Sequence, residues 1–305
     1  LPLRAFRSHL SSVRAAERTS QLPPSPYKKR HALLTFGYCG TNYWGLQSQT
    51  ALGDPERPTV SDIIRRALLE TGGIAESNLA PLSRTKWTLA SRTDKGVHAE
   101  AHAANFKTES VIPVEGFRRG LNANLADDLA IVAVTEVEES FDARYNAVAK
   151  TYQYRLQVGE TRLPHHHWNT WYMRNDMDLD RMNEAAQHLL GVHRFGAFRA
   201  RGCTSHTAER RMYAVDITQE SGSPIVVITV TGNAFLRNMV RILAGTLVEV
   251  GEGRRAPESV IHALESQERS DAGITAPARG LTLKTVHFEG YPRLGKPDLS
   301  KPAPG

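Results

Sequence analysis

The sequence contains few cysteines and no long apolar segment. Only Cys39 and Cys203 occur among its 305 residues, which is too few for a disulfide scaffold, a four-ligand zinc site or a CxxC redox pair, so a reducing compartment is expected. The apolar stretches, such as residues 225–228, fall far short of the roughly 18 residues that a membrane-spanning helix requires. Apolar residues make up 40% of the chain and charged residues 23%, which is typical of a globular protein. These features exclude an integral membrane protein, a fibrous protein and extensive disorder.

The sequence also lacks the motifs of common cofactor sites. A glycine-rich loop at residues 37–45 follows a predicted strand, but it has neither a GK[ST] ending nor regular GxGxxG spacing, so nucleotide binding is not favoured there. The run 165–167 holds three histidines, but adjacent histidines converge poorly on one ion, and no Cys or carboxylate is suitably spaced. We therefore expect no metal and no other cofactor.

The positive charge is concentrated at the start of the chain. The formal net charge is +6, from 38 Lys plus Arg against 32 Asp plus Glu. Residues 1–30 hold seven of the basic residues and one of the acidic ones, so the remaining 275 residues carry 31 of each sign. An Arg-rich, Ser-rich and acid-poor leader resembles an organelle transit peptide.

This leader gives two expectations for location. If residues 1–30 are a transit peptide, the protein is expected in the mitochondrion or plastid; otherwise it is expected in the cytoplasm or nucleus. Two other interpretations of the leader stay open. It could be a disordered basic arm that follows RNA phosphates, or an upstream extension that does not belong to the gene product.

Hydrophobic periodicity predicts an α+β protein built from two ferredoxin-like (split βαβ) halves around a largely antiparallel mixed sheet. The first half has the order strand, helix, strand, strand, helix, strand, and the second repeats this order less clearly. We expect a leader at 1–30, an N-terminal half at 31–140, a C-terminal half at 141–290 and a tail at 291–305. Strands are expected at 31–38, 87–91, 101–108, 129–137, 150–158, 210–218, 224–231 and 281–288, and helices at 61–70, 114–125, 180–190, 234–250 and 257–265.

Two charged segments are candidates for chemistry. Residues 91–99 (SRTDKGVHA) form a polar loop between two predicted strands, with Asp94 between Arg92 and Lys95. Neighbouring cations favour an ionised carboxylate, which can act as a nucleophile or base. A helix that begins near Asn233 would place Arg237 and Arg241 on one face. Taken alone, the loop could be a simple turn and the arginines a solvated helix flank.

Five segments in sequence order resemble the TruA family of tRNA pseudouridine synthases. The similarity covers roughly residues 31–290. The fold that it implies has a central catalytic cleft. The matching segments are RTDKGVH at 92–98, LNANL at 121–125, FDARYNAVAKTYQY at 141–154, NAFLRNMVRILAGTLVEVG at 233–251 and PARGLTL at 277–283.

The resemblance implies an isomerase that converts uridine to pseudouridine in tRNA without a metal or another cofactor. It implies that Asp94 acts on the ribose, either by attacking C1′ or by removing the C2′ proton, and that Arg237 ion-pairs with Asp94. Tyr152 would stack on the target base, although Tyr154 on the same strand could be mistaken for it. Leu281, in preference to Leu283, would form the apolar wall opposite.

The resemblance also implies that the target base is flipped out of its stem. Arg92 would fill the space that the base vacates, and we place Arg241 and Lys95 among the residues that bind substrate. The rest of the footprint would be RNA phosphates, recognised through local clusters of arginines. The candidates for these clusters are Arg118 with Arg119 and Arg199 with Arg201.

The expected partner is tRNA, with modification in the anticodon arm and a homodimeric enzyme, and no membrane partner is expected. Two alternatives stay open: a pseudouridine synthase that acts on organellar ribosomal or messenger RNA, and a catalytically silent RNA-binding module of the same fold. A metal-dependent nuclease is disfavoured because the sequence offers no clustered pair of carboxylates.

Overall fold

The computed structural model describes residues 30–48, 54, 56–74 and 87–290. The tail expected at 291–305, and all of the expected leader except Arg30, lie outside the described residues. In the described ranges, no helix is both long enough and apolar enough to cross a membrane.

Ten strands and five α-helices are found in the described residues. The strands are β1 (Arg30–Tyr38), β2 (Thr88–Leu89), β3 (His98–Thr108), β4 (Leu129–Glu136), β5 (Ala147–Val158), β6 (Trp171–Met173), β7 (Gly191–Arg194), β8 (Glu209–Gln219), β9 (Ile225–Gly232) and β10 (Leu281–Phe288). The helices are α1 (Val60–Glu70), α2 (Val114–Ala123), α3 (Leu179–Gln187), α4 (Met239–Gly251) and α5 (Ser259–Ser266).

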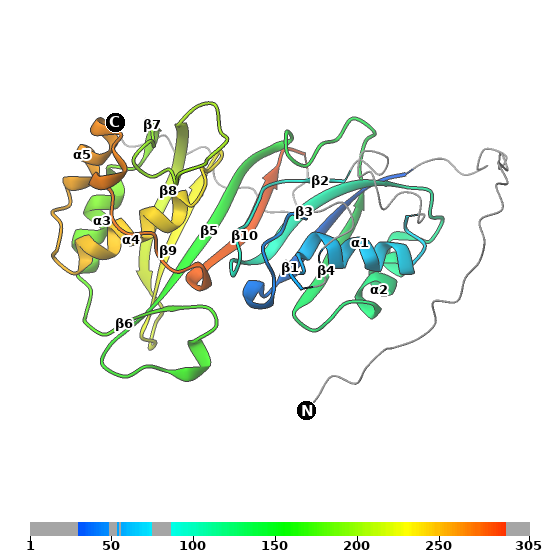
Figure 1. Ribbon diagram of the computed structural model, residues 1–305, viewed down its shortest axis with the longest axis horizontal. Coiled ribbons are helices and arrows are strands. Elements are labelled where there is room, and N and C mark those ends of the chain that lie inside the picture. The colour runs from blue at the N-terminus through cyan, green and yellow to red at the C-terminus, as the bar shows by residue number, and fades with distance from the viewer. Residues whose placement is uncertain (1–29, 49–53, 55, 75–86, 291–305) are drawn as a thin grey trace.

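All of these strands belong to one sheet, which confirms the expected α+β class. The strand order is β4-β1-β3-β10-β5-β9-β8-β7, with β2 paired to β3 and β6 paired to β5. The pairs β3–β10 and β5–β6 are parallel and the other pairs are antiparallel. The sheet runs along the molecule, with α1 and α2 towards one end and α3, α4 and α5 towards the other (Figure 1).

Each half of the sheet has the strand order of a ferredoxin-like unit. The chain order β1, α1, β2, β3, α2, β4 gives the sheet order β4-β1-β3-β2, and the chain order β5, α3, β8, β9, α4, β10 gives β10-β5-β9-β8. In both halves the order is therefore fourth, first, third, second strand. The strands β6 and β7 and the helix α5 are additions to the second unit.

The first unit shows how local sequence defines an element. Helix α1 begins after Thr59, whose side-chain oxygen accepts a hydrogen bond from the Asp62 backbone N–H at 3.3 Å. This cap satisfies one of the N–H groups that the first helical turn leaves unpaired. The buried side chains Ile64 and Leu68 are four residues apart and so lie on the helix face that meets the core.

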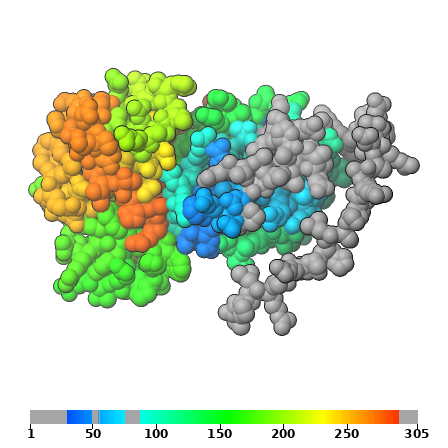
Figure 2. Space-filling model, viewed as in Figure 1, coloured from blue at the N-terminus to red at the C-terminus, as the bar shows by residue number. Residues whose placement is uncertain are grey.

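The two halves are joined through strands β3 and β10. Their parallel register pairs Thr282 with His98 and Leu283 with Ala99. In the space-filling view, blue and cyan residues of the first half meet yellow and orange residues of the second (Figure 2). Because β3 begins directly after residues 91–97, this junction brings the charged loop of the first half next to the second half.

The structure corrects the predicted start of helix α4. The helix begins at Met239, whereas the sequence pattern predicts a helix from 234 and places Arg237 on its face. The preceding residue, Asn238, has φ 58°, in the left-handed region that a right-handed helix cannot contain. Hydrogen bonds from the backbone N–H groups of Ala234 and Arg211 to Asn233 Oδ1 hold the segment before it as a loop.

The apolar spacing of α4 extends back to Leu236, which lies in this loop. Periodicity alone therefore could not locate the start of the helix.

The short strands β6 and β7 were not predicted. They have three and four residues, which is too short for a two-residue alternation to stand out.

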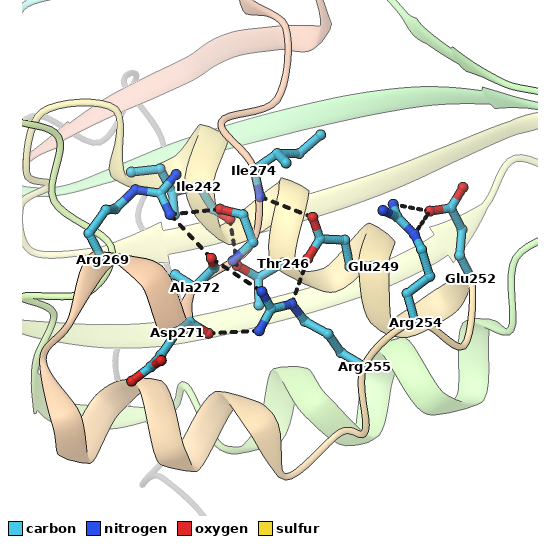
Figure 3. Close-up of polar contacts among 11 residues, drawn as sticks. Ile242, Thr246, Glu249, Glu252, Arg254, Arg255, Arg269, Asp271, Ala272 and Ile274 are labelled. Atoms are coloured by element: carbon cyan, nitrogen blue, oxygen red, sulfur yellow. Dashed lines mark hydrogen bonds and ion pairs between the residues drawn. The ribbon is translucent and has the colours of Figure 1, made fainter.

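A polar network holds the segment that follows α5 against α4 (Figure 3). Arg255 forms an ion pair with Glu249 and donates to Asp271 O at 2.8 Å, and Glu249 accepts from the Ile274 N–H at 3.1 Å. Burial by itself raises the pKa of Glu249, but hydrogen bonds from Arg255 and Ile274 outweigh it and lower this pKa. The segment 271–276 is thereby fixed on a helix that is buried along most of its length.

Gly245 lets this segment approach α4 closely, which gives a test of the packing. A Cβ atom on Gly245 would lie 1.9 Å from Ile274 O, a backbone atom. We expect Gly245→Ala to lower the free energy of unfolding by about 1–3 kcal/mol, because the backbone must shift. Chemical denaturation measures this change.

The matched control is Gly120→Ala in helix α2. Its Cβ would meet only Thr71 Cγ2 at an ordinary 3.5 Å. The alanine should leave stability unchanged or raise it by about 0.5–1 kcal/mol, because alanine is the better helix former. Equal stability of wild type and Gly245→Ala would contradict the packing.

Candidate active site

Residues of the first half of the protein hold the loop that carries Asp94. The Tyr38 hydroxyl and Thr93 Oγ1 share a hydrogen bond of 2.6 Å, and both residues are buried. The Leu46 N–H donates to Thr93 O at 3.2 Å, and the Val97 N–H donates to Asp94 O at 3.1 Å. These contacts on both sides of Asp94 hold its backbone while leaving 41% of its side chain exposed.

The glycine-rich loop at 37–45 packs directly on the Asp94 loop. A Cβ on Gly40 would lie 2.0 Å from Val97 O, and a Cβ on Gly45 would lie 2.9 Å from Thr93 O. Gly45 also has φ 95°, which favours glycine. These two glycines are therefore explained by the close approach of two backbone segments.

Asp94 forms an ion pair with Arg241, across the boundary between the two halves. Arg241 Nη1 lies 3.7 Å from Asp94 Oδ2. Arg241 is the third residue of α4 and its side chain is 17% exposed. Because Asp94 is partly solvated, the pair contributes on the order of 0–1 kcal/mol to stability. Its larger effect is to orient the carboxylate.

The backbone around Arg241 holds its side chain in place. Arg241 Nε donates to Ala276 O at 2.7 Å and Nη1 donates to Asn238 Oδ1 at 3.2 Å, while Arg241 O accepts from the Ala276 N–H at 3.1 Å. Ala276 ends the segment 271–276 that the network of Figure 3 fixes on α4. The buried network thus supports the guanidinium that faces Asp94.

Arg237 does not occupy the position expected for the partner of Asp94. It lies before α4, and its Nη1 donates to Arg201 O at 3.3 Å. The Ala200 N–H in turn donates to Arg237 O at 3.1 Å. The displaced helix start explains the difference, because Arg237 and Arg241 do not share a helix face. Arg241, expected to bind substrate, is instead the arginine that pairs with Asp94.

Tyr152 contacts the Asp94 loop through Ser91, and its ring is neutral. Its ring packs edge-on against Phe235, with centroids 5.1 Å apart and an interplanar angle of 83°. Burial raises the pKa of Tyr152 to about 12; a hydrogen bond with Ser91 opposes this rise and the charge of Asp94 adds to it. The phenol therefore stays protonated at neutral pH.

Tyr154 has a structural role, which separates it from Tyr152. Its ring is fully buried, its hydroxyl donates to Pro277 O at 2.8 Å, and a Cβ on Gly280 would lie 2.6 Å from its Cζ. This packing leaves no room for a base on Tyr154.

The two leucines lie on the neighbouring strand. The register of β10 with β5 places Leu283 opposite Tyr152 and Leu281 opposite Tyr154. Both leucines are buried, with exposed fractions of 0% and 6%. Leu283 is therefore the leucine directly beside Tyr152.

Arg92 and Lys95 flank Asp94 in the sequence without pairing with it in the described residues. Neither makes an ion pair with Asp94 in the described part of the chain, where Arg241 is the cation within 4.0 Å of that carboxylate. Arg92 is exposed. Lys95 Nζ lies 3.3 Å from the centroid of the Trp44 ring, and Arg57 Cζ lies 5.0 Å from it.

Sequence reasoning missed the polar residues around Tyr152. Ser91 hydrogen-bonds to Tyr152, and its hydroxyl lies 3.1 Å from His102 Nε2. Lys150 lies two residues before Tyr152 on the same strand. Their signal in the sequence was polar residues within predicted strands, which is weak because half of each strand commonly faces solvent.

Metal ligands are not assembled in the described ranges. Residues 30–48, 54, 56–74 and 87–290 contain no group of three or more His, Cys, Asp or Glu side chains that could hold an ion. His165 and His166 lie in the short 3-10 helix Pro164–His166, with their rings 4.2 Å apart.

Comparison with known proteins identifies similar enzymes. Residues 185–289 match the family model described as tRNA pseudouridine synthase. The tRNA pseudouridine synthase A of Geotalea uraniireducens (strain Rf4) is 39% identical over 259 residues, which is 85% of this chain and 100% of the relative. Its counterpart in Pelobacter propionicus is 40% identical over 84% of this chain and 98% of the relative. The counterpart in Myxococcus xanthus is 39% identical over 85% of this chain and 92% of the relative.

A solved Cbf5-Nop10-Gar1 complex is similar at 10% identity, over 71% of this chain and 45% of that chain, with a TM-score of 0.30. This likeness carries no argument here.

Proposed function

Because the chain belongs to the tRNA pseudouridine synthase A family and so isomerises uridine to pseudouridine in tRNA, we propose that Asp94 is its catalytic residue. The observation that carries this proposal is the partly exposed Asp94 carboxylate 3.7 Å from the Arg241 guanidinium. A guanidinium at this distance attracts the carboxylate and fixes its direction.

The reaction needs one carboxylate because it conserves all atoms. The bond between N1 of uracil and C1′ breaks, C5 of uracil bonds to C1′, C5 loses its proton and N1 gains one. Asp94 starts this exchange either as a nucleophile at C1′ or as a base at the C2′ proton. Glycoside hydrolases, in contrast, use two carboxylates to bring in water.

Tyr152 and Leu281 are proposed to hold the uracil while it turns. The neutral ring of Tyr152 lies near enough to Asp94 to be influenced by its charge, and it makes a T-shaped contact with Phe235. An aromatic surface stabilises a stacked base by about 1–3 kcal/mol without fixing its rotation. The register places Leu283 beside Tyr152, but Leu283 is fully buried, whereas Leu281 keeps 6% of its surface exposed. Leu281 is therefore the leucine proposed to form the apolar wall.

Arg92 is proposed to replace the target base after it leaves its stem. Flipping a base out costs a few kcal/mol of stacking and pairing. Arg92 is exposed beside Asp94, and it makes no hydrogen bond or ion pair with the described part of the chain. Its guanidinium is thus free to stack in the vacated space.

A cluster of arginines before α4 is proposed to bind RNA phosphates. Arg237 holds the loop that carries Arg199 and Arg201 through its hydrogen bond to Arg201 O, and it is close in sequence to the Asp94 partner Arg241. Arg118, a second candidate, already forms an ion pair with Glu115. The cluster of Arg199, Arg201 and Arg237 is therefore the better phosphate site.

Two finer properties are proposed from the family resemblance. We propose that the modified uridines lie in the anticodon arm of tRNA and that the enzyme is a homodimer, whose mass light scattering measures. Neither property changes the roles proposed for Asp94 and Arg241.

Asp94→Asn tests the catalytic assignment. The amide keeps the shape of the carboxylate but can act neither as nucleophile nor as base, so we expect product formation to fall below detection while tRNA binding remains. Mapping of pseudouridine at single-nucleotide resolution on treated tRNA measures both activity and target position.

The matched control is Asp127→Asn, an exposed aspartate on a loop of the same half, which should keep full activity. Full activity of Asp94→Asn would refute the assignment. Modified sites outside the anticodon arm would refute only the proposed position.

Substitutions of Arg241 and Arg237 should affect different kinetic constants. Arg241→Gln removes the partner of Asp94, and we expect kcat to fall by about 100-fold or more. Arg237→Gln removes a proposed phosphate contact, so KM should rise several-fold with kcat little changed. Single-turnover assays on tRNA distinguish the effects, and the reverse pattern would return the pairing role to Arg237.

The leader can be tested separately from catalysis. We propose from its composition that residues 1–30 direct import into an organelle. A fluorescent protein carrying residues 1–30 should then enter the mitochondrion or plastid, and residues 31–305 alone should keep tRNA affinity and kcat. Weaker tRNA binding by residues 31–305 would instead favour a basic arm that contacts RNA.

A further inference from the structure

Lys150 lies buried on the floor of the site. It is on strand β5, two residues before Tyr152, and so faces the same side of the sheet at a Cα separation of roughly 7 Å. Its neighbours in the sheet are Gly232 on β9 and Val286 on β10. Only 7% of Lys150 is exposed.

Among the described residues no anionic group compensates the charge of Lys150. In the described ranges its Nζ makes no ion pair or hydrogen bond, and the charged group that influences it is Arg144. Burial first, and then Arg144, lower the pKa of Lys150 to about 8. It remains mostly cationic at neutral pH and is destabilised there, because burial of an unpaired cation costs several kcal/mol. Stability of the fold does not explain a lysine at this position.

The other polar groups nearby cannot neutralise it. Burial and, to a smaller extent, the charge of Lys150 lower the pKa of His102 to about 3. His102 is therefore neutral. His102 Nε2 is paired with the Ser91 hydroxyl, while His102 Nδ1 is buried without a partner in the described structure. The Ser91 hydroxyl also reaches Tyr152. An unpaired cation and an unpaired polar atom thus lie beside the residue proposed to stack on the uracil.

We propose that Lys150 binds a phosphate of the tRNA strand next to the target uridine, an inference that rests on the proposed function. A nucleotide stacked on Tyr152 brings its flanking phosphates to within a few ångströms of the floor around it. Those phosphates are the anions that the substrate necessarily carries into the site. They supply the negative charge that Lys150 does not find among its protein neighbours. The compact ammonium group of Lys150 binds a phosphate as a point charge.

The test compares Lys150→Met with Lys150→Arg in equilibrium tRNA binding at several salt concentrations. Loss of one phosphate contact should weaken binding by Lys150→Met roughly tenfold at low salt and reduce the slope of log K against log salt by about 0.7–0.9. Lys150→Arg should stay within about threefold of wild type and keep its slope. The melting temperature of Lys150→Met should equal or exceed that of wild type, since an unpaired buried charge is removed.

Lys107→Met is the matched control, because Lys107 is a strand lysine whose Nζ is 2.6 Å from Glu139 Oε1. It should bind tRNA like wild type. A pH series adds an independent readout: wild-type affinity should fall above about pH 8 as Lys150 loses its proton, and Lys150→Arg should not show this fall. The titratable side chains near Lys150 keep their protonation in this window, since the pKa of His102 is about 3 and that of Tyr152 is about 12. The remaining charged neighbour is the Arg144 guanidinium.

Wild-type affinity and salt slope in Lys150→Met would overturn the proposal. So would equal losses in Lys150→Met and Lys150→Arg together with lowered melting temperatures, because that pattern shows a structural role. Pseudouridine formation by wild type is measured in parallel. If wild type modifies tRNA but Lys150→Met binds normally, only the Lys150 assignment fails; if wild type makes no pseudouridine, the proposed function fails.

Discussion

The parallel pairing of β3 with β10 is the constraint on which the site depends. Asp94 belongs to the first ferredoxin-like half, whereas Arg241 and Tyr152 belong to the second. The register of β3 with β10 and of β10 with β5 brings the Asp94 loop next to the strand of Tyr152. Arg241 reaches the same region from α4, which packs against β5. An ion pair between exposed groups is too weak to hold two halves together. The continuous sheet therefore fixes the ion pair, and the ion pair fixes only the direction of the carboxylate.

Two polar networks near the site differ in how well they are satisfied. Glu249, Arg255 and the backbone of 271–276 form a network in which donors and acceptors are paired (Figure 3). Such a network rigidifies what it contacts, and here that is the segment that supports Arg241. The groups around Tyr152 are incompletely paired within the described residues, where Lys150 has no anionic partner and His102 Nδ1 has no hydrogen-bond partner. Proteins keep such costly groups where a ligand completes them.

The charge of the protein has to be considered locally. The body of the chain after residue 30 carries equal numbers of basic and acidic residues, so its net charge gives no general attraction for RNA. Within the described residues Arg199, Arg201 and Arg237 make no ion pair, whereas Arg118 is paired with Glu115. The proposed attraction for RNA is therefore placed at the first three arginines. A nearly neutral protein can thus bind a polyanion through a polarised surface.

The sequence by itself determined the α+β class, the paired βαββαβ order, most strand positions and the segments that define the family. These features depend on local periodicity and on motifs of adjacent residues, which a linear chain displays. Only the tertiary structure decided which arginine faces Asp94, because one left-handed residue, Asn238, delays the start of α4 and removes Arg237 from the helix. The tertiary structure also places Tyr154 in the core and leaves Lys150 without an ion pair among the described residues. Partners distant in sequence set those properties, and the register of the sheet, which local sequence does not encode, brings those partners together.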